Sequence, residues 1–242
     1  MIRTLRSSLF YVGFTAWTLI WAIFALPVAL LPLSARVWNS RLWARTGVGW
    51  LHWSCGLRYR ISGLENIPAT PCVVVANHQS ALETLLLWCI FPRLSYVLKQ
   101  ELLRIPIIGW GLRLSWPIGI DRDAGKRALV QVIEEGKLRL AAGFNVVIFP
   151  EGTRHPCGAV GPFSSTAAGL AIRAHAPLLP IAVNTGCFWP RADWRKRPGV
   201  VELRIGPVLA AEGKAAVLNQ QAQNWITAAV EEMGTGSHPK AS

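Results

Sequence analysis

The N-terminal region carries a long segment without a charged side chain, and this segment restricts the folds open to the chain. From Ser7 to Ala35 there are 29 consecutive uncharged residues. A transmembrane helix needs about 20 residues, and the apolar part of a signal peptide has only about 7–15. Pro27 and Pro32 interrupt the segment and disfavour one straight helix. The segment predicts membrane association, as a span or a hairpin. A cleaved signal peptide and a buried core hairpin are the alternatives.

The next segment, 36–56, alternates three arginines with four tryptophans, which is typical of a helix in the membrane interface. The sequence has 25 Lys and Arg against 13 Asp and Glu, and every acid lies at Glu65 or later. A net charge of +12 favours nucleic acid or an anionic lipid surface as partner. The cations accompany tryptophans, and no zinc-finger or RNA-binding motif occurs. We therefore expect a membrane partner and no nucleic acid, with a hairpin entering one leaflet.

From residue 57 onward, short apolar segments alternate with amphipathic ones. This alternation predicts an α/β domain with a mixed, largely parallel sheet flanked by helices. Strands are expected at 57–62, 72–76, 94–98, 146–149, 178–183 and 200–205, and helices at 81–91, 126–142, 166–175 and 215–232. Asp123 is the expected N-cap of the helix at 126–142. The predicted organisation is membrane-associating helices at 1–56, an α/β domain at 57–233 and a disordered tail at 234–242.

The five cysteines are scattered, odd in number and form no Cys-x-x-Cys pair. This spacing predicts neither a disulfide framework nor a zinc site, and we expect free thiols in a reducing compartment.

The first motif with catalytic residue types is the segment 77–83, Asn-His-Gln-Ser-Ala-Leu-Glu, directly after an apolar strand. Strand ends in α/β sheets collect catalytic groups. Histidine is the usual general base near neutral pH, and a carboxylate can orient its ring. His78 and Glu83 are therefore a candidate pair. Ser80-x-x-Glu83 is equally well a capping box that starts a helix, and the two hypotheses are compatible.

Two further motifs contain arginine next to an apolar strand. The segment 118–122, Ile-Gly-Ile-Asp-Arg, contains Arg122, which can bind phosphate through paired hydrogen bonds. Taken alone, a surface Asp–Arg pair is the better explanation. The segment 149–154, Phe-Pro-Glu-Gly-Thr-Arg, follows a predicted core strand. Gly152 allows close backbone approach to a ligand, Arg154 can bind an anion and Glu151 can accept from a hydroxyl. A turn with solvated charges is the alternative.

These motifs, followed by Leu-Pro-Ile-Ala-Val at 179–183, occur in an order that resembles the glycerophosphate and lysophosphatidic acid acyltransferase family, and in particular its bacterial 1-acyl-glycerol-3-phosphate members. The resemblance covers roughly residues 57–210. It implies that His78 takes the proton of the sn-2 hydroxyl of a lysophospholipid, with Glu83 as its partner. The alkoxide then attacks the thioester of acyl-CoA or acyl carrier protein, without a covalent enzyme intermediate.

The resemblance also implies the binding residues and the surroundings. It assigns the acceptor's phosphate and glycerol to Arg122, Glu151, Gly152, Thr153 and Arg154, and the acyl region to Leu179, Pro180, Ile181 and Val183. No metal or bound cofactor is expected, since acyl-CoA or acyl carrier protein is a co-substrate. Both donors are cytoplasmic, so the expected place is the cytoplasmic face of a bacterial inner membrane.

The sequence departs from the family's pattern in three places, at four positions. Glu83 stands where the family usually has Asp, and Trp116 stands where it often has Gly. Ser164 and Thr166 stand where a Lys and a Gly are common. Because the Lys is missing, one alternative is another lyso-lipid acceptor, such as a lyso-aminolipid. Because Glu83 replaces Asp, a second alternative is a non-catalytic membrane-bound relative. A hydrolase with a serine nucleophile is not indicated, because no Gly-x-Ser-x-Gly elbow occurs.

Overall fold

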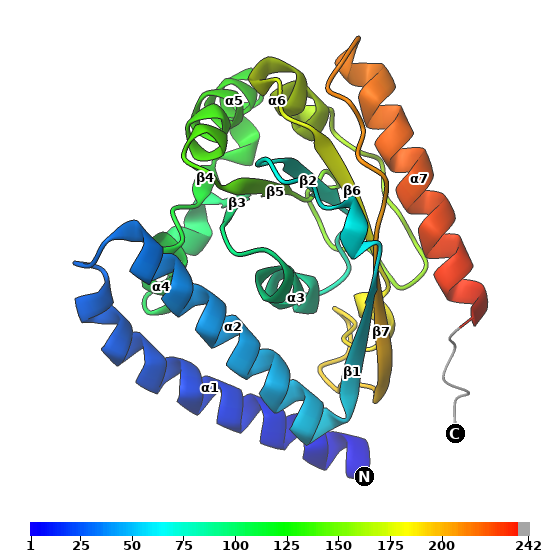
Figure 1. The fold of residues 1–242 in the computed structure, drawn as a ribbon. Helices are drawn as coiled ribbons and strands as arrows, with labels where there is room; N and C mark the ends of the chain where they lie inside the picture. Colours follow the sequence, from blue (N-terminus) through cyan, green and yellow to red (C-terminus); the bar gives the residue numbers. More distant parts are fainter. Residues whose placement is uncertain (237–242) are drawn as a thin grey trace.

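The computed structural model describes residues 1–236, without the side chains of Leu26, Arg122, Thr235 and Gly236. The chain begins with two antiparallel helices, α1 (Ile2–Val28) and α2 (Leu33–Cys55), which lie along one side of the molecule with α1 outermost (Figure 1). Pro27 falls in the last turn of α1 and Pro32 directly precedes α2, so the two prolines delimit the connection. Gly56, with φ of 69°, ends α2 in the left-handed conformation that favours glycine.

The two helices pack closely because small residues on each face large aromatic rings on the other. A Cβ at Gly13 would lie 2.4 Å from the Trp50 ring, and one at Gly47 would lie 2.6 Å from the Phe14 ring. The Trp50 indole N–H donates to the Phe10 carbonyl at 3.1 Å. Within the described residues, α1 alone is long and apolar enough to cross a membrane, over Ile2–Ala25. That α1 and α2 enter one leaflet as a hairpin, in place of a span by α1, stays a prediction.

The rest of the chain forms a seven-stranded sheet in the order β1-β7-β6-β2-β5-β3-β4. All neighbours are parallel except β6 and β7, which confirms the mixed, largely parallel sheet. The strands are β1 (Leu57–Ser62), β2 (Val73–Ala76), β3 (Leu94–Lys99), β4 (Ile118–Ile120), β5 (Asn145–Ile148), β6 (Leu178–Val183) and β7 (Gly199–Ile205). Because β2, β3, β4 and β5 are parallel, the loops that follow them meet at one edge of the sheet.

Helices cover both faces of the sheet (Figure 1). They are α3 (Leu82–Ile90), α4 (Ile108–Leu114), α5 (Lys126–Ala141), α6 (Thr166–Ala174) and α7 (Ala215–Gly236), with short 3₁₀ turns η1 (Leu64–Asn66), η2 (Gln100–Arg104), η3 (Arg122–Ala124) and η4 (Thr185–Cys187). Alternate side chains of β2 enter different cores. Val74 packs on the side of α2 and α3, whereas Val73 packs on the side of α6 and α7. The second helix of the N-terminal hairpin thus completes one of the two cores.

Most predicted elements occur within one or two residues of their expected ends, and two short ones were not predicted. β4 has only three residues, and α4 is a seven-residue helix flanked by a proline and containing two glycines, so neither has a usable periodicity. The predicted N-cap Asp123 is wrong. Asp123 lies in η3, where its own N–H is bonded to the Asp121 side chain at 3.0 Å. α7 continues to Gly236, three residues into the predicted tail, and residues 237–242 lie outside the described part.

The departure at Trp116 has a conformational explanation. Its φ is 54°, in the left-handed region that favours glycine. Here the strained residue is held on both sides. The Arg139 guanidinium lies 3.9 Å from the centre of the indole ring, and the Trp116 carbonyl accepts from the Ser95 hydroxyl at 2.8 Å.

Candidate active site

The site centres on His78 and Glu83, which the loop after β2 and the first turn of α3 bring together. Nδ1 of His78 lies 2.7 Å from Oε1 of Glu83. An ionised carboxylate can only accept hydrogen bonds, so the proton is assigned to Nδ1 and the lone pair to Nε2. The His78 side chain is 17% exposed, whereas the Glu83 side chain is fully buried. The pair therefore combines a reachable imidazole with a shielded carboxylate.

Four further donors surround the Glu83 carboxylate. Oε1 accepts from the backbone N–H groups of Gln79 and Ser80, each at 2.8 Å. Oε2 accepts from the Ser80 hydroxyl at 2.9 Å and from the Thr185 hydroxyl at 2.6 Å. Burial alone would raise the pKa of Glu83, but the hydrogen bond and charge of His78, with the Thr185 and Ser80 donors, lower it below its usual value. Glu83 is therefore held as an anion beside the imidazole.

The capping interaction and the His–Glu pair coexist, as the two hypotheses allowed. Glu83 accepts from the Ser80 N–H, and the Ser80 hydroxyl accepts from the N–H of Leu82 at 2.9 Å. These are the reciprocal contacts of a helix start. The same carboxylate reaches His78, so the helix start positions the carboxylate for the imidazole.

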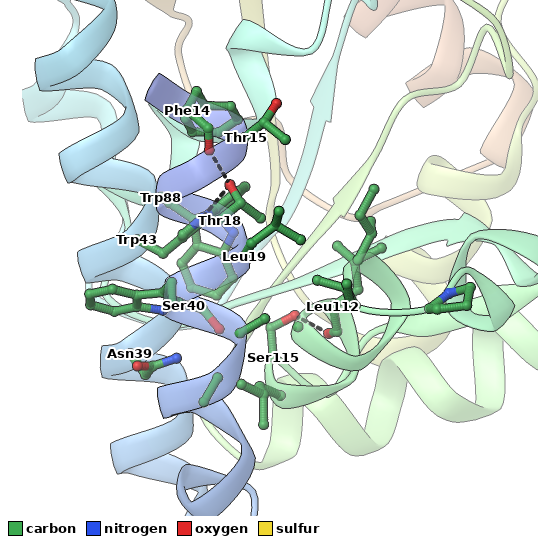
Figure 2. A pocket seen from close by; sticks show the side chains of 18 residues that line it. Phe14, Thr15, Thr18, Leu19, Asn39, Ser40, Trp43, Trp88, Leu112 and Ser115 are labelled. Carbon is green, nitrogen blue, oxygen red and sulfur yellow. Dashed lines mark hydrogen bonds between the residues drawn. The ribbon is translucent and has the colours of Figure 1, made fainter. Parts of the chain in front are cut away.

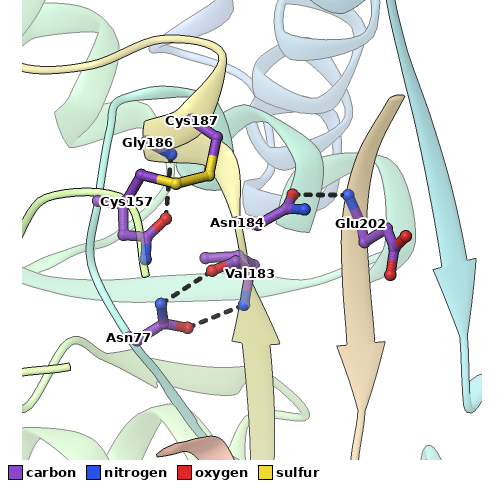
Figure 3. The surroundings of a disulfide bond; sticks show 8 residues. Asn77, Cys157, Val183, Asn184, Gly186, Cys187 and Glu202 are labelled. Atoms are coloured by element: carbon purple, nitrogen blue, oxygen red, sulfur yellow. Dashed lines mark hydrogen bonds between the residues drawn. A yellow bond between two sulfur atoms is a disulfide. The ribbon is translucent and has the colours of Figure 1, made fainter. Parts of the chain in front are cut away.

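Residues at and after the end of β6 hold the loop from the other side, and sequence reasoning missed two of them, Thr185 and Gly186. Asn77 exchanges two hydrogen bonds with the backbone of Val183, at 2.8 and 2.9 Å (Figure 3). The Gly186 N–H donates to Oε1 of Gln79 at 3.1 Å. Thr185 lies 102 residues from Glu83, and no local pattern marks it. Its position two residues after the Leu-Pro-Ile-Ala-Val motif at 179–183 was the available signal.

A disulfide between Cys157 and Cys187 corrects the prediction of free thiols. The two residues are 30 apart in sequence, but the fold brings their Cα atoms to 4.8 Å (Figure 3). Spacing could not reveal the pair because the contact depends on how β5 and β6 flank β2. The disulfide joins the loop of the third motif to η4, which also carries Thr185. Cys55, Cys72 and Cys89 are free thiols.

The third motif lies beside His78, but Glu151 mainly holds backbone. Its carboxylate accepts from the N–H of His78 at 2.8 Å and from the N–H of Gly161 at 3.0 Å. Burial raises the pKa of Glu151, against these two hydrogen bonds. Gly152 has φ of 67°, and a Cβ there would meet nothing within 4 Å. The turn thus favours glycine, and the space where a Cβ would lie is open.

Among the predicted anion-binding residues, the side chains of Thr153 and Arg154 are described, whereas only the backbone of Arg122 is. Thr153 and Arg154 are exposed, and Thr153 accepts from Arg191 at 3.3 Å. Arg122 begins η3 directly after β4, at the same sheet edge as His78, and its side chain lies outside the described part. Ser164 donates to the Thr166 hydroxyl at 3.3 Å, and its N–H donates to the Pro150 carbonyl at 3.0 Å. Contact of these residues with substrate stays a prediction.

The predicted acyl-lining residues of β6 are core residues in this structure. Leu179, Ile181 and Val183 are fully buried on the side of α3, and Pro180 is buried on the opposite face. The wall next to His78 is instead aromatic. The His78 ring stacks on Phe149 with ring centres 4.3 Å apart, and Tyr96 stacks on the Phe149 ring at 6.3 Å. The role of the β6 residues toward an acyl chain stays a prediction.

An apolar cavity of about 400 Å³ lies where α4 meets the N-terminal hairpin. Its walls include Phe14 and Leu19 of α1, Trp43 of α2, Trp88 of α3 and Leu112 of α4 (Figure 2). Neither His78 nor the predicted residues of β6 line it. In the described part of the chain, no group of three or more His, Cys, Asp or Glu side chains has the arrangement of a metal site.

Comparison with known proteins gives one consistent result. Residues 58–184 match the family described as Acyltransferase. The whole chain is 41% identical to a 1-acyl-sn-glycerol-3-phosphate acyltransferase from Pseudomonas aeruginosa, 98% of which is covered. It is 32% identical to 1-acyl-sn-glycerol-3-phosphate acyltransferase alpha from Mus musculus, over 83% of this chain and 71% of that one. The crystal structure of the 1-acyl-sn-glycerophosphate acyltransferase from Thermotoga maritima is similar with a TM-score of 0.82, at 26% identity over 98% of both chains.

Proposed function

The chain belongs to the Acyltransferase family, and we propose that it transfers an acyl chain from a thioester donor to the sn-2 hydroxyl of 1-acyl-sn-glycerol-3-phosphate, forming phosphatidic acid. The observation that carries the proposal is the 2.7 Å contact between Nδ1 of His78 and a buried, multiply hydrogen-bonded carboxylate. This arrangement leaves Nε2 without a proton, as a general base requires.

The proposed reaction uses His78 twice. Nε2 takes the proton of the acceptor hydroxyl as its oxygen attacks the thioester carbon. The carbon–sulfur bond then breaks, and the imidazolium returns the proton to the leaving thiolate. The Glu83 carboxylate stabilises the imidazolium between these steps and keeps the ring in one tautomer. Glu83 replaces the usual Asp, and the Ser80 and Thr185 hydroxyls donate to its Oε2.

The proposed acceptor site lies on the loops at the same sheet edge. Arg154 and Arg122 would bind the phosphate, with Thr153 and the backbone at Gly152 next to the glycerol. Glu151 would contribute mainly through the loop, since it accepts from the backbone of His78. Leu179, Pro180, Ile181 and Val183 are proposed to border the acyl chain. The donor is acyl-CoA or acyl carrier protein, and we propose that no bound cofactor or metal takes part.

The proposed location is the cytoplasmic face of a bacterial inner membrane. Support comes from α1, whose outward side exposes large apolar residues from Ile2 to Phe24, and from the arginines and tryptophans of α2. The acyl donors named above are soluble, whereas the acceptor and product carry acyl chains that stay in the bilayer. An enzyme anchored at the surface reaches both.

Thiol release from acyl-CoA by purified protein in detergent tests this function. Release that requires lysophosphatidic acid and falls at least about 100-fold in His78→Ala would support it. His175→Asn is the matched control, because His175 is an exposed histidine at the end of α6 and should be dispensable. Release without acceptor would indicate a hydrolase. Preference for a lyso-aminolipid would support the alternative raised by Ser164, and inactivity with both CoA and carrier-protein donors would contradict the proposal.

A further inference from the structure

The segment that follows β3 exposes an unusual number of large apolar side chains. It comprises η2 and α4, and four side chains within nine residues are 40, 40, 53 and 52% exposed, namely Leu102, Ile105, Ile108 and Trp110. Scattered exposed apolar residues need no explanation, but a contiguous group marks an interaction surface. The proposed acyl transfer does not use this segment directly.

The backbone of this segment contains one strained residue. Ile107 has φ of 68° and ψ of −61°, which a β-branched residue rarely adopts. The N–H of Gly109 donates to the Ile105 carbonyl at 2.7 Å, and a Cβ at Gly109 would lie 2.3 Å from the Leu103 carbonyl oxygen. Close backbone packing thus fixes the turn. Strain that persists in this way commonly serves a function.

The apolar surface of this segment continues onto the N-terminal hairpin. α4 lies beside the connection between α1 and α2 (Figure 1), and the Arg36 guanidinium donates to the Arg113 carbonyl at 3.4 Å. Leu19 of α1 and Ile108 of α4 line the same cavity, and both side chains also remain exposed. The exposed apolar surface is therefore continuous from α1 to α4.

The charges around this surface select the kind of partner. Lys99, Arg104 and Arg113 are exposed, and Glu101 is the only acid between residues 99 and 114. Glu101 lies 3.6 Å from Lys99 and offsets one of the three cations. Apolar side chains flanked by excess cations are typical of segments that lie in the interface of an anionic membrane.

We propose that η2 and α4 form a second membrane-contacting element, which inserts Ile105, Ile108 and Trp110 into an anionic lipid surface next to α1. This inference rests on the membrane placement in the proposed function. η2 begins where β3 ends, and this is the same sheet edge that carries the His78 loop. The element brings the lipid surface to the catalytic edge, so an acceptor can present its headgroup while its chain stays in the bilayer.

A lipid-depth measurement tests the contact directly. An environment-sensitive dye on Ile105→Cys is compared with the same dye on Leu138→Cys, an exposed apolar position of α5, in vesicles of phosphatidylcholine and phosphatidylglycerol with nitroxide-labelled lipid. Labelling of the native cysteines is subtracted with unsubstituted protein. We expect clearly stronger quenching at 105 than at 138. Equal quenching would overturn the proposal, and a dye at 105 shielded from lipid within a dimer would assign this surface to a second copy of the chain.

An activity comparison tests the consequence. Ile108→Glu with Trp110→Glu should lower the rate with lysophosphatidic acid in vesicles by about fivefold or more, because insertion is opposed, and leave the rate in detergent within about twofold. Val130→Glu on α5 is the control, because Val130 is an exposed apolar residue away from this surface. An unchanged vesicle rate would overturn the proposal. If unsubstituted protein were inactive in detergent, the proposed function would fail, and the quenching result would still decide the membrane contact.

Discussion

Glu83 and Lys196 are charged side chains that are both buried, near opposite ends of the segment between β6 and β7. The two charges differ in how well hydrogen bonds from their surroundings stabilise them. Glu83 accepts five hydrogen bonds, and the pKa is lowered, so its charged form is favoured. Lys196 is 1% exposed and has two hydrogen-bond acceptors, the Tyr11 hydroxyl and the Trp194 carbonyl. Its Nζ lies 4.0 Å from the centre of the Tyr11 ring and 4.2 Å from that of Trp189.

The pKa of Lys196 shows that these surroundings disfavour the charged form of the lysine. Burial lowers it to about 8, because two acceptors and aromatic faces replace the ammonium's hydration only in part. The backbone N–H of Lys196 also donates to the Ser7 hydroxyl at 2.8 Å, so the residue ties α1 to the same segment that carries Thr185. The comparison suggests that the chain fully satisfies a buried charge where the chemistry uses it and accepts a partly satisfied one where the role is attachment.

The largest effect on the rate is expected when the Glu83 carboxylate itself is changed. In Glu83→Gln the amide oxygen can take the donors at Oε1 and the amide N–H groups can donate to the two hydroxyls, so the fold is kept. The negative charge that stabilises the imidazolium is lost, and kcat should fall about 10³-fold. Steady-state kinetics with a melting curve checks this. Glu83→Asp keeps the charge and should retain more activity than Glu83→Gln, and equal activities would contradict the role of the charge.

The next largest effect on the rate is expected when the Thr185 hydroxyl alone is removed from the surroundings of the Glu83 carboxylate. Thr185→Val preserves shape and removes the hydroxyl that donates to Oε2 at 2.6 Å. A hydrogen bond to a charged group contributes about 1.5–3 kcal/mol, so kcat should fall by about 10- to 100-fold. Thr185→Ser restores the donor and should restore most of the rate. A pH–rate profile of Thr185→Val that coincides with the original would show that Thr185 does not act through Glu83.

The lowered pKa of Lys196 makes a prediction about stability at alkaline pH. Below pH 8 the lysine is protonated in both folded and unfolded chains. Between about 8 and the ordinary value of 10.5, the unfolded chain holds more protons, so the free energy of unfolding should rise with pH. After allowance for solvent screening, we expect a gain of about 1–2 kcal/mol. Chemical denaturation of the original and of Lys196→Met isolates this contribution, and parallel pH dependences would contradict it.

The smallest expected effect concerns the same substitution at neutral pH. Lys196→Met keeps the apolar stem between the rings and removes a charge that the site satisfies only in part. The free energy of unfolding should therefore change by less than about 1 kcal/mol. Glu83→Leu, of similar size to its parent, leaves the surrounding donors unpaired and should cost about 3–5 kcal/mol. Denaturation midpoints of the two variants measure the contrast, and similar losses would remove the distinction between the two sites.

The sequence by itself determined what depends on neighbours along the chain. The uncharged N-terminal segment and the arginines and tryptophans of 36–56 predicted the two helices, and alternating apolar segments predicted most strands of the sheet. His78 and Glu83 were predictable as a pair, because only five positions separate them and Glu83 lies in the first turn of the helix that follows His78. The capping pattern of Ser80 and Glu83 was readable for the same reason.

Only the tertiary structure decided which distant groups meet at this pair. Thr185 reaches Glu83 from 102 residues away, and Cys187 reaches Cys157 across 30 residues. Both contacts depend on β6 and β5 flanking β2, and strand order leaves no periodic trace in a single sequence. The strained turn at Ile107, which exposes α4 beside α1, depends likewise on backbone packing around Gly109. Local propensity fixes elements, whereas contacts between remote elements fix the surroundings of each charge.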